Sequence, residues 1–478
     1  MERFKETDFI KKDISNRKWK KELDTGAYEE KMLTQRGFVN DNNRLKFNHA
    51  VFIRYAMTRL CAVNCNERIY FYNFSEKRYV QLEEAQYTKI FFYIIEEASP
   101  TIWKKSYESD YLPYFYRKLD YSENNGMKPG LLHFTNGILD VDENTFYEPD
   151  SEIFSLVQLP YDFDENAEAP KFKRFLNEIF EEDRSRIDLI QEIMGACLYY
   201  EDIMQKLVIF LGKGSNGKSL LSNIIKKMIG EKNVSAIALD SLSGGRFSKQ
   251  NLDRKLLNIS SETKTEKLYS TADLKSLTGG DSTEIEEKYA KSYTTEIHSK
   301  FILLANDMIQ TKDYSDGFYR RLLIIPFNQC FRDRDPEKED EEGILYKDVY
   351  LEAELEKELP GIFNFAYDGL MRLFENDFNF TYSKACADEL EHYKNEHNVV
   401  KAFYNSCVEV YDETSKVKTK TTVVYNAFLK YCRQNHFNGN MSSTIFHRLF
   451  KNILEDENNG ARPIHINSGD YYKNVFLK

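Results

Sequence analysis

The sequence lacks any long hydrophobic run. Within its 478 residues, no apolar stretch approaches the ~20 residues that a helix needs to span a bilayer. Residues 1–21, which are rich in charge, also lack the apolar centre of a secretory signal peptide. We therefore expect a cytoplasmic protein that has no membrane partner.

Cysteine is scarce and scattered. Of the seven cysteines, only Cys61 and Cys65 stand close together, and no second pair nearby completes a zinc site. This spacing favours reduced, mostly buried thiols over a zinc centre.

Positive charge is in deficit over the whole chain. The 77 acidic residues outnumber the 66 Lys and Arg, which gives a formal net charge of −11. This balance excludes a chain that is coated in positive charge. It does not exclude nucleic acid as a partner, because a basic patch in one domain or in a pore is sufficient. The length allows two to four globular domains.

The clearest motif that is present lies between Lys206 and Gly230. Residues 207–211 form a short apolar run typical of a buried parallel strand, and residues 220–229 repeat apolar side chains at helical spacing. Between them, GKGSNGKS fits the pattern G-x-x-x-x-G-K-[ST] at every required position. Such a loop directs backbone N–H groups and a helix N-terminus at phosphate groups. We predict nucleotide binding, with ATP as the cofactor, by the following residues: Gly212, Lys213, Gly214, Ser215, Asn216, Gly217, Lys218 and Ser219.

Mg²⁺ is the second cofactor that this chemistry requires. The Lys218 ammonium would reach the β- and γ-phosphates, and the Ser219 hydroxyl would ligate the metal. A second short apolar strand ends in Ser261 and Glu262. Glu262 suits activation of the attacking water, and both residues would support Mg²⁺ through water. A strand that ends in Glu is common, so this signal is weak when it is taken alone.

Two further segments complete the pattern. Residues 300–306 form a third apolar strand that ends in Asn306, whose amide can contact the γ-phosphate or its water. Arg320 and Arg321 precede a fourth apolar strand, and a planar guanidinium suits the charge that develops in phosphoryl transfer. For either arginine the alternative is a surface ion pair. The order of all four elements is stronger evidence than any one of them.

In this order the segments resemble the superfamily 3 helicases, which are ring-forming AAA+ motors of viruses, phages and plasmids. The resemblance assigns Walker A to 212–219, Walker B to Ser261–Glu262, the sensor asparagine to Asn306, and the arginine finger to Arg320 or Arg321. It also implies a homo-hexamer that hydrolyses ATP at subunit interfaces.

The segment between the second and third strands narrows the resemblance. Residues 274–281, LKSLTGGD, resemble the diagnostic segment of the phage/plasmid and poxvirus primase–helicase branch, and residues 285–298 read as a hairpin. In that family the hairpin projects into the pore of the ring and grips single-stranded DNA. Lys288 and Lys291 match its basic residues best, although neighbouring glutamates dilute the charge.

The resemblance implies a replication initiator helicase of a phage, plasmid or genomic island that acts on single-stranded and forked DNA with 3′→5′ polarity. Such a protein works in the cytoplasm of a bacterial cell or of a host. Residues 1–130 contain no recognisable primase site, so a separate primase or host replication proteins are the expected partners. Two alternatives remain: a P-loop ATPase that remodels or packages another substrate, and a DNA-binding initiator in which ATP only switches assembly.

The C-terminal residues are locally basic. From Thr414 to Lys478 the chain has ten Lys or Arg against four Asp or Glu. Two predicted helices, 423–432 and 442–454, are followed by a hairpin that turns at Ser468–Gly469, an order that suggests a winged helix. His447, Arg448 and Lys451 lie on its candidate recognition helix, where they would contact origin duplex DNA. A winged helix that contacts protein is the alternative.

The overall prediction is an α/β protein with an AAA+ P-loop core built on a parallel sheet. An α+β and helical N-terminal region precedes this core, and a winged-helix domain follows it. Helices 351–373, interrupted at Pro360–Gly361, would form the lid of the motor. The expected domains are 1–130, 131–200, which ends in a helical collar, 201–380 for the motor, and 384–478.

Overall fold

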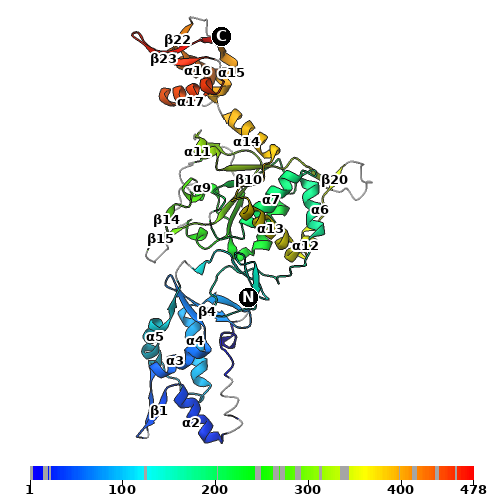
Figure 1. The fold of residues 1–478 in the computed structure, drawn as a ribbon. Helices are drawn as coiled ribbons and strands as arrows, with labels where there is room; N and C mark the ends of the chain where they lie inside the picture. The colour runs from blue at the N-terminus through cyan, green and yellow to red at the C-terminus, as the bar shows by residue number, and fades with distance from the viewer. Residues whose placement is uncertain are drawn as a thin grey trace.

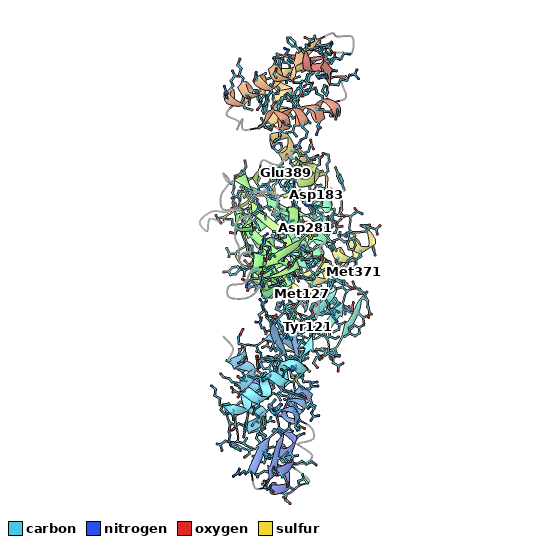
Figure 2. All side chains as sticks on the ribbon, turned by 90° about the vertical axis from the view of Figure 1, so that its left-hand side faces the viewer. Tyr121, Met127, Asp183, Asp281, Met371 and Glu389 are labelled. Atoms are coloured by element: carbon cyan, nitrogen blue, oxygen red, sulfur yellow. The ribbon has the colours of Figure 1, made fainter. Side chains whose placement is uncertain are left out.

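The computed structural model describes most of the chain. The described residues are 4–13, 20, 23–42, 44–122, 126–201, 203–242, 249–261, 268–269, 275–285, 292–311, 315–333, 344–397, 399–411, 417–435, 441–457 and 460–478. Figure 1 shows an N-terminal region at one end, a central α/β region, and a C-terminal unit at the other end. In Figure 2, Tyr121 and Met127 lie where the N-terminal and central regions meet, and Glu389 lies at the end of the central region nearest the C-terminal unit.

The N-terminal region has its own core, in which helices pack on a small sheet. Four strands pair in the order β5-β4-β3-β6, and only β3 and β6 run parallel. The helix α4 buries one apolar face, including Ile90, Phe91 and Ile94, in this core. The elements are η1 (Glu6–Phe9), α2 (Thr25–Gln35), β1 (Phe38–Asp41), β2 (Arg44–Phe47), α3 (His49–Arg59), β3 (Ala62–Cys65), β4 (Arg68–Asn73), β5 (Arg78–Gln81), α4 (Glu84–Glu96), α5 (Ser106–Lys118) and β6 (Asp120–Tyr121).

A three-stranded antiparallel sheet and two helices lead into the central region. The sheet has the order β7-β8-β9. The helix α7 begins after Asp183, whose carboxylate accepts hydrogen bonds from the backbone N–H groups of Ser185 and Arg186 and thus caps the first turn. The elements are β7 (Leu131–His133), β8 (Ile138–Asp140), β9 (Thr145–Tyr147), α6 (Pro170–Ile179) and α7 (Arg184–Ala196).

The central region is built on five parallel strands in the order β11-β12-β16-β10-β18. The three inner strands are almost wholly buried and rich in Leu, Ile and Val, as expected for a parallel sheet that is covered on both faces. This confirms the predicted α/β class with a parallel sheet. The strands are β10 (Leu207–Leu211), β11 (Val234–Ser235), β12 (Leu257–Ser261), β16 (Lys300–Ala305) and β18 (Leu322–Pro326).

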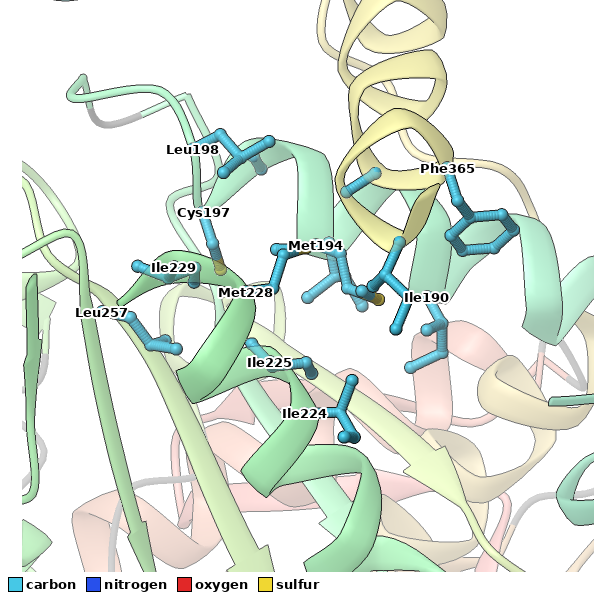
Figure 3. Close-up of a cluster of buried hydrophobic side chains, with 14 of the residues drawn as sticks. Ile190, Met194, Cys197, Leu198, Ile224, Ile225, Met228, Ile229, Leu257 and Phe365 are labelled. Carbon is cyan, nitrogen blue, oxygen red and sulfur yellow. The ribbon is translucent and has the colours of Figure 1, made fainter. Parts of the chain in front are cut away.

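The helix α8 (Lys218–Ile229) is fixed by contacts with the helix α7 and with the parallel sheet. Figure 3 shows Ile225 and Met228 of α8 close to Met194 and Cys197 at the end of α7, in the same buried cluster as Leu257 of β12. Since α8 starts directly after the glycine loop, this packing also fixes the end of that loop.

The remaining elements of the central region are short, apart from the helices α13 and α14. They are η3 (Glu231–Asn233), α9 (Leu239–Leu242), η4 (Lys249–Leu252), β13 (Leu268–Tyr269), β14 (Ser282–Ile285), β15 (Tyr293–Glu296), β17 (Gln310–Thr311), α11 (Asp316–Tyr319), β19 (Phe331–Arg332), β20 (Leu345–Tyr346), α12 (Leu351–Glu356), α13 (Leu359–Glu375) and α14 (Lys384–His397). A hairpin is present, but it begins earlier than the predicted 285–298, because β14 and β15 pair antiparallel from Ser282↔Glu296 to Ile285↔Tyr293.

The predicted interruption at Pro360–Gly361 is wrong. The break lies at residues 357–358, between α12 and α13, and both Pro360 and Gly361 belong to the first turn of α13. Proline is tolerated there because the first helical N–H groups have no intrahelical partner. Gly361 permits a close approach, since a Cβ atom would lie 2.3 Å from the carbonyl oxygen of Glu168.

The C-terminal unit has a separate core that begins at Val400. The helix α14, which the sequence analysis grouped with this unit, packs on the central region: Tyr393 donates a 2.7 Å hydrogen bond to the carbonyl oxygen of Ile309. Two helices and a hairpin occur as expected, with Ser442 as the N-cap of α17. The elements are α15 (Val399–Cys407), β21 (Val408–Val410), β22 (Lys418–Lys420), α16 (Thr421–Gln434), α17 (Ser443–Asp456), β23 (Arg462–Ile466), β24 (Gly469–Lys473) and β25 (Val475–Leu477).

The hairpin of this unit turns one residue earlier than predicted, at residues 467–468. Its strand β24 also pairs with β22, which gives a three-stranded sheet in the order β22-β24-β23.

Among the described residues, no helix is both long and apolar enough to cross a membrane.

Glycine permits a close contact between the helices α7 and α13. A Cβ atom on Gly195 would lie 2.4 Å from the carbonyl oxygen of Ala366, and one on Gly369 would lie 2.3 Å from that of Gln191. Any larger residue must separate the two helices, which together support α8.

We expect Gly195→Ala to lower the free energy of unfolding by about 1–3 kcal/mol, the usual cost of overpacking, despite the better helix propensity of alanine. Urea denaturation of the purified protein measures the change. Gly26→Ala is the matched control, because the nearest atom to its added Cβ lies 3.6 Å away. Equal stability of Gly195→Ala and the wild type would contradict the proposed tight contact.

Candidate active site

The glycine loop follows the carboxyl end of β10 and is bent by left-handed residues. Gly214, Ser215 and Gly217 have φ values of +100°, +50° and +86°. Gly217 is the N-cap of α8, and a Cβ atom there would lie 2.7 Å from Cγ2 of Ile179. Left-handed residues next to right-handed ones turn successive N–H groups toward one point, which forms an anion-binding concavity.

A cavity of about 590 Å³ opens over this loop. Its size falls within the usual range of small-ligand sites. From the loop and the start of α8, Gly214 through Leu220 line the cavity, whereas Gly212 and Lys213 are absent from its lining. The predicted phosphate loop therefore forms one wall of a pocket.

The ammonium of Lys218 lies inside this wall. Its Nζ donates to the carbonyl oxygen of Gly212 and, at 3.1 Å, to Oδ1 of Asn216. The Asn216 amide in turn donates to the carbonyl oxygen of Phe327 at 3.2 Å. Lys218 is only 6% exposed, and burial lowers its pKa. A phosphate group beside Nζ would reverse that effect, since an opposite charge favours the ammonium form.

Ser261 and Asn306 lie at the same edge of the sheet as the loop. The register pairs Leu211 with Ala305 and Ser261 with Leu304, so the carboxyl ends of β10, β12 and β16 are level. Ser261, Asn306 and the exposed Ser219 all line the cavity. Glu262 lies outside the described residues.

The rest of the pocket wall comes from segments that no sequence motif marked. Phe175 of α6, Phe331 of β19 and Tyr346 of β20 give it an aromatic side, with Val349 at its rim. The N–H of Phe331 donates to the carbonyl oxygen of Ser215 at 2.7 Å, which ties β19 to the glycine loop. Val349 is 82% exposed although it is apolar. Only the structure reveals this side, because its residues are far apart in the sequence.

Arg320 and Arg321 lie at the opposite edge of the sheet. They directly precede β18, which runs parallel to β10, so they lie beside its amino end, next to Lys206. The Lys206 ammonium donates to the carbonyl oxygen of Arg320, and burial together with the charges of both arginines lowers the pKa of Lys206. Arg320 is exposed, whereas Arg321 donates from Nη1 to the carbonyl oxygen of Gly317 at 2.7 Å. Neither arginine lines the cavity of its own chain.

The candidate DNA contacts divide into two groups. Lys288 and Lys291, which stand between β14 and β15 in the sequence, lie outside the described residues. On α17, Arg448 is exposed, and Lys451 approaches Glu455 at 3.5 Å. His447 is half-buried, with Nδ1 2.9 Å from the hydroxyl of Tyr472. The His447 side chain therefore joins α17 to β24, a contact that the charge pattern did not indicate.

The described residues contain no cluster of three or more His, Cys, Asp or Glu that could hold a metal ion. The donors present fit Mg²⁺ that arrives with a nucleotide, because Mg²⁺ is usually held by one or two protein groups together with phosphate oxygens and water.

We expect Lys218→Ala to weaken binding of a fluorescent ATP analogue by at least about 10-fold, since a charge-assisted contact contributes about 1.5–3 kcal/mol. Lys213→Ala is the matched control, because this exposed lysine of the same loop is absent from the pocket lining. Fluorescence titration measures both affinities. Equal losses in the two variants would show that general charge, rather than the pocket geometry, holds the nucleotide.

Two segments of the chain match known families. Residues 117–181 match a family described as D5 N terminal like, and residues 210–321 match a family of unknown function, DUF5906. The second match begins in β10 and ends at Arg321, so it includes the whole glycine loop, Asn306 and both arginines.

Three curated viral proteins, each named Putative helicase, are similar in sequence. The one from Acanthamoeba polyphaga mimivirus is 28% identical over 262 residues, which cover 52% of this chain and 27% of that protein. Those from Invertebrate iridescent virus 3 and Invertebrate iridescent virus 6 are 27% and 23% identical, over 48% and 65% of this chain. The chain spans between 26% and 35% of the length of these relatives.

Among solved structures, the A-form apo structure of the NrS-1 C-terminal region aligns with a TM-score of 0.47 and 16% identity, over 86% of this chain and 95% of that chain. By its sequence the chain is related to the viral proteins named above, which confirms the predicted resemblance to the phage and viral primase–helicase branch.

Proposed function

We propose that the protein is an ATP-dependent DNA helicase that initiates replication, with ATP hydrolysed at the interfaces of a ring. The observation that carries the proposal is that the predicted site residues lie at opposite ends of the strands of one parallel sheet. The pocket with Lys218, Ser219, Ser261 and Asn306 occupies the carboxyl edge, whereas Arg320 and Arg321 lie beside the amino edge. The sequence similarity to proteins named as helicases supports the choice of substrate.

Within one subunit, the described residues suit the binding of Mg²⁺-ATP. The N–H groups of the glycine loop and the start of α8 would hold the phosphates, Lys218 would contact the β- and γ-phosphates, and Ser219 would ligate Mg²⁺. The bound Mg²⁺ would neutralise charge on the phosphate oxygens. Asn306 and Glu262 are proposed to orient the attacking water, and Ser261 to reach the metal through water.

A second subunit would complete the site. A guanidinium that reaches the phosphoryl group from a neighbour gives rate factors of about 10³–10⁵ in related chemistry. The exposed Arg320 is suited to extend toward a neighbour, and the carbonyl oxygen of Gly317 holds the Arg321 side chain close by. The AAA+ layout and the hexamer are part of this proposal.

Two elements would contact DNA. The hairpin β14–β15 would carry Lys288 and Lys291 into the pore, where phosphate contacts need point charges rather than base-reading groups. The C-terminal unit would use Arg448 and Lys451 to bind origin duplex, as a winged helix. Forked and single-stranded DNA are the proposed substrates, with 3′→5′ polarity and a primase or host replication proteins as partners.

Mixing two inactive variants tests the shared site. We expect Arg320→Ala or Arg321→Ala to lower the ATPase rate by about 10³-fold while nucleotide affinity stays within a few-fold, because the arginine acts only in the transition state. Mixing that variant with Lys218→Ala should restore activity, since some interfaces then hold one intact pocket and one intact arginine. No recovery for either arginine variant would contradict an intersubunit site.

Neutralising the hairpin tip tests the substrate. We expect the double variant Lys288→Ala and Lys291→Ala to keep its DNA-free ATPase rate but lose stimulation by single-stranded DNA and unwinding of a forked duplex. Its DNA affinity should also fall less steeply with salt, by about one unit of slope per lost phosphate contact. Lys394→Ala and Lys401→Ala, in α14 and α15, serve as a charge-matched control.

Two outcomes would redirect the proposal. Wild-type ATPase activity that DNA leaves unchanged favours a motor that remodels or packages another substrate. DNA-stimulated ATPase without any unwinding of forked duplex favours an initiator in which ATP only switches assembly.

A further inference from the structure

A buried pair of charged residues lies between the N-terminal region and the hairpin β14–β15. Asp253 and Arg254 follow η4 and precede β12, and their side chains are 3% and 8% exposed. They lie outside the nucleotide pocket, and no motif in the sequence marked them. Their burial needs an explanation, because burying a charged side chain is costly and Asp and Arg are seldom fully buried unless they are paired.

The backbone around this pair is constrained. The buried hydroxyl of Ser299, which follows β15, donates to the carbonyl oxygens of Leu252 at 3.0 Å and Lys255 at 2.7 Å. These contacts hold both ends of the short loop on the sheet. Arg254 has a φ of +57°, a left-handed conformation that a residue with a long side chain seldom adopts. The loop therefore presents its two charged side chains in one fixed arrangement.

The pair makes contacts on two sides. Arg254 Nη1 donates to the hydroxyl of Tyr70 on β4 at 2.5 Å, across 184 residues of sequence. The hydroxyl of Tyr293 on β15 donates to Asp253 Oδ2 at 2.8 Å. Arg254 Nε lies 3.5 Å from the same carboxylate oxygen. A continuous polar path thus runs Tyr70–Arg254–Asp253–Tyr293, from the N-terminal sheet to the hairpin.

The pair is not fully satisfied in this arrangement. Asp253 Oδ1 and the Arg254 atoms Nε and Nη2 are buried without a hydrogen-bond partner among the described residues. Burying such atoms unpaired is costly, and a contact that served stability alone would be expected to pair them. Spare donors and a spare acceptor allow the pair to exchange partners when its neighbours move.

The hairpin β14–β15 depends on contacts outside its own two strands. Among the described residues, these strands pair only with each other, and a two-stranded hairpin is marginally stable by itself. Ile297, which follows β15, packs in the central core at the open end of the hairpin, and Ile285, the partner of Tyr293 in the register, packs in the same core at the other end. The hydroxyl contact of Tyr293 with Asp253 adds a polar contact at the start of β15, where it can affect the position of that strand.

We propose that Asp253 and Arg254 are positioning residues that couple the N-terminal region to the hairpin β14–β15. A shift of Tyr70 changes the position of Arg254, which changes the hold of Asp253 on Tyr293 and so the position of the hairpin. The coupling itself rests on these contacts, and its effect on DNA rests on the proposed function, in which the hairpin grips the strand. A partner that binds the N-terminal region would thereby alter the DNA contact of the motor.

Removing one hydroxyl at each end of the path tests the coupling. Tyr70→Phe and Tyr293→Phe delete the two end contacts and keep both rings. Tyr79→Phe is the matched control, because its hydroxyl donates to the carbonyl oxygen of Ser151 at 2.5 Å, in the same N-terminal sheet but outside the path. Amide hydrogen exchange of the full-length protein, without nucleotide or DNA, is followed in residues 292–297.

We expect Tyr70→Phe to raise the exchange rates in residues 292–297 by about threefold to tenfold, the effect of one lost hydrogen bond, and Tyr79→Phe to leave them unchanged. The double variant Tyr70→Phe with Tyr293→Phe should show no more than the larger single effect, because both changes break one path. A change confined to β4 and β5, or effects that multiply in the double variant, would overturn the coupling.

A second readout connects the coupling to DNA. Tyr70→Phe should raise the DNA concentration for half-maximal ATPase stimulation by the same factor and leave the DNA-free rate unchanged. If Tyr70→Phe alters the exchange rates in residues 292–297 but leaves the DNA concentration for half-maximal ATPase stimulation unchanged, the proposed effect on DNA is overturned. If DNA fails to stimulate the wild type, the proposed function fails instead, and the exchange experiment still decides the coupling.

Discussion

The common direction of five strands is the constraint on which the proposed chemistry depends. Parallel strands place all their carboxyl ends at one edge, so the glycine loop, Ser261 and Asn306 meet there although they are far apart in the sequence. The same constraint places Arg320 and Arg321 beside the other edge. A five-residue strand is about 16 Å long. If the arginines act in phosphoryl transfer as proposed, one chain holds both halves of the site and cannot bring them together, which is why a second copy enters the proposal.

The pocket also depends on packing that lies behind it. The loop is held at one end by β10 and at the other by α8, which packs in turn on α7 and α13. Glycines at the α7–α13 crossing let these helices approach closely, so their small size contributes to the position of α8. The aromatic side of the pocket comes from α6, which precedes the parallel sheet in the chain, and from β19 and β20, which follow it.

The sequence predicted the parts of this structure that local rules determine. The strand, loop and helix around residues 207–229 follow from apolar spacing and required glycines. The antiparallel pairing of β14 with β15 was also predicted. All these features arise within about 25 residues of sequence, where short-range spacing carries the information.

The features that escaped prediction depend on contacts between distant segments. Pro360–Gly361 suggests a break by its composition, yet the pair begins a helix because a close contact with Glu168 requires glycine there. The contact of the His447 ring with the hydroxyl of Tyr472 was not predicted, and the role of His447 in DNA binding stays a prediction. The pairing of Asp253 and Arg254 with Tyr293 and Tyr70 joins three segments that no period or motif relates. Glu262, Lys288 and Lys291 lie outside the described residues, so their roles stay predictions.

The central claim is that one subunit supplies the pocket and its neighbour supplies the arginine. A particle image of the protein with a non-hydrolysable ATP analogue and forked DNA tests this most directly. We expect a closed ring in which Arg320 or Arg321 of one subunit faces the phosphates bound at Lys218 of the next subunit, with one DNA strand in the pore. Particles with nucleotide bound but both arginines turned to solvent, away from any neighbouring pocket, would contradict it.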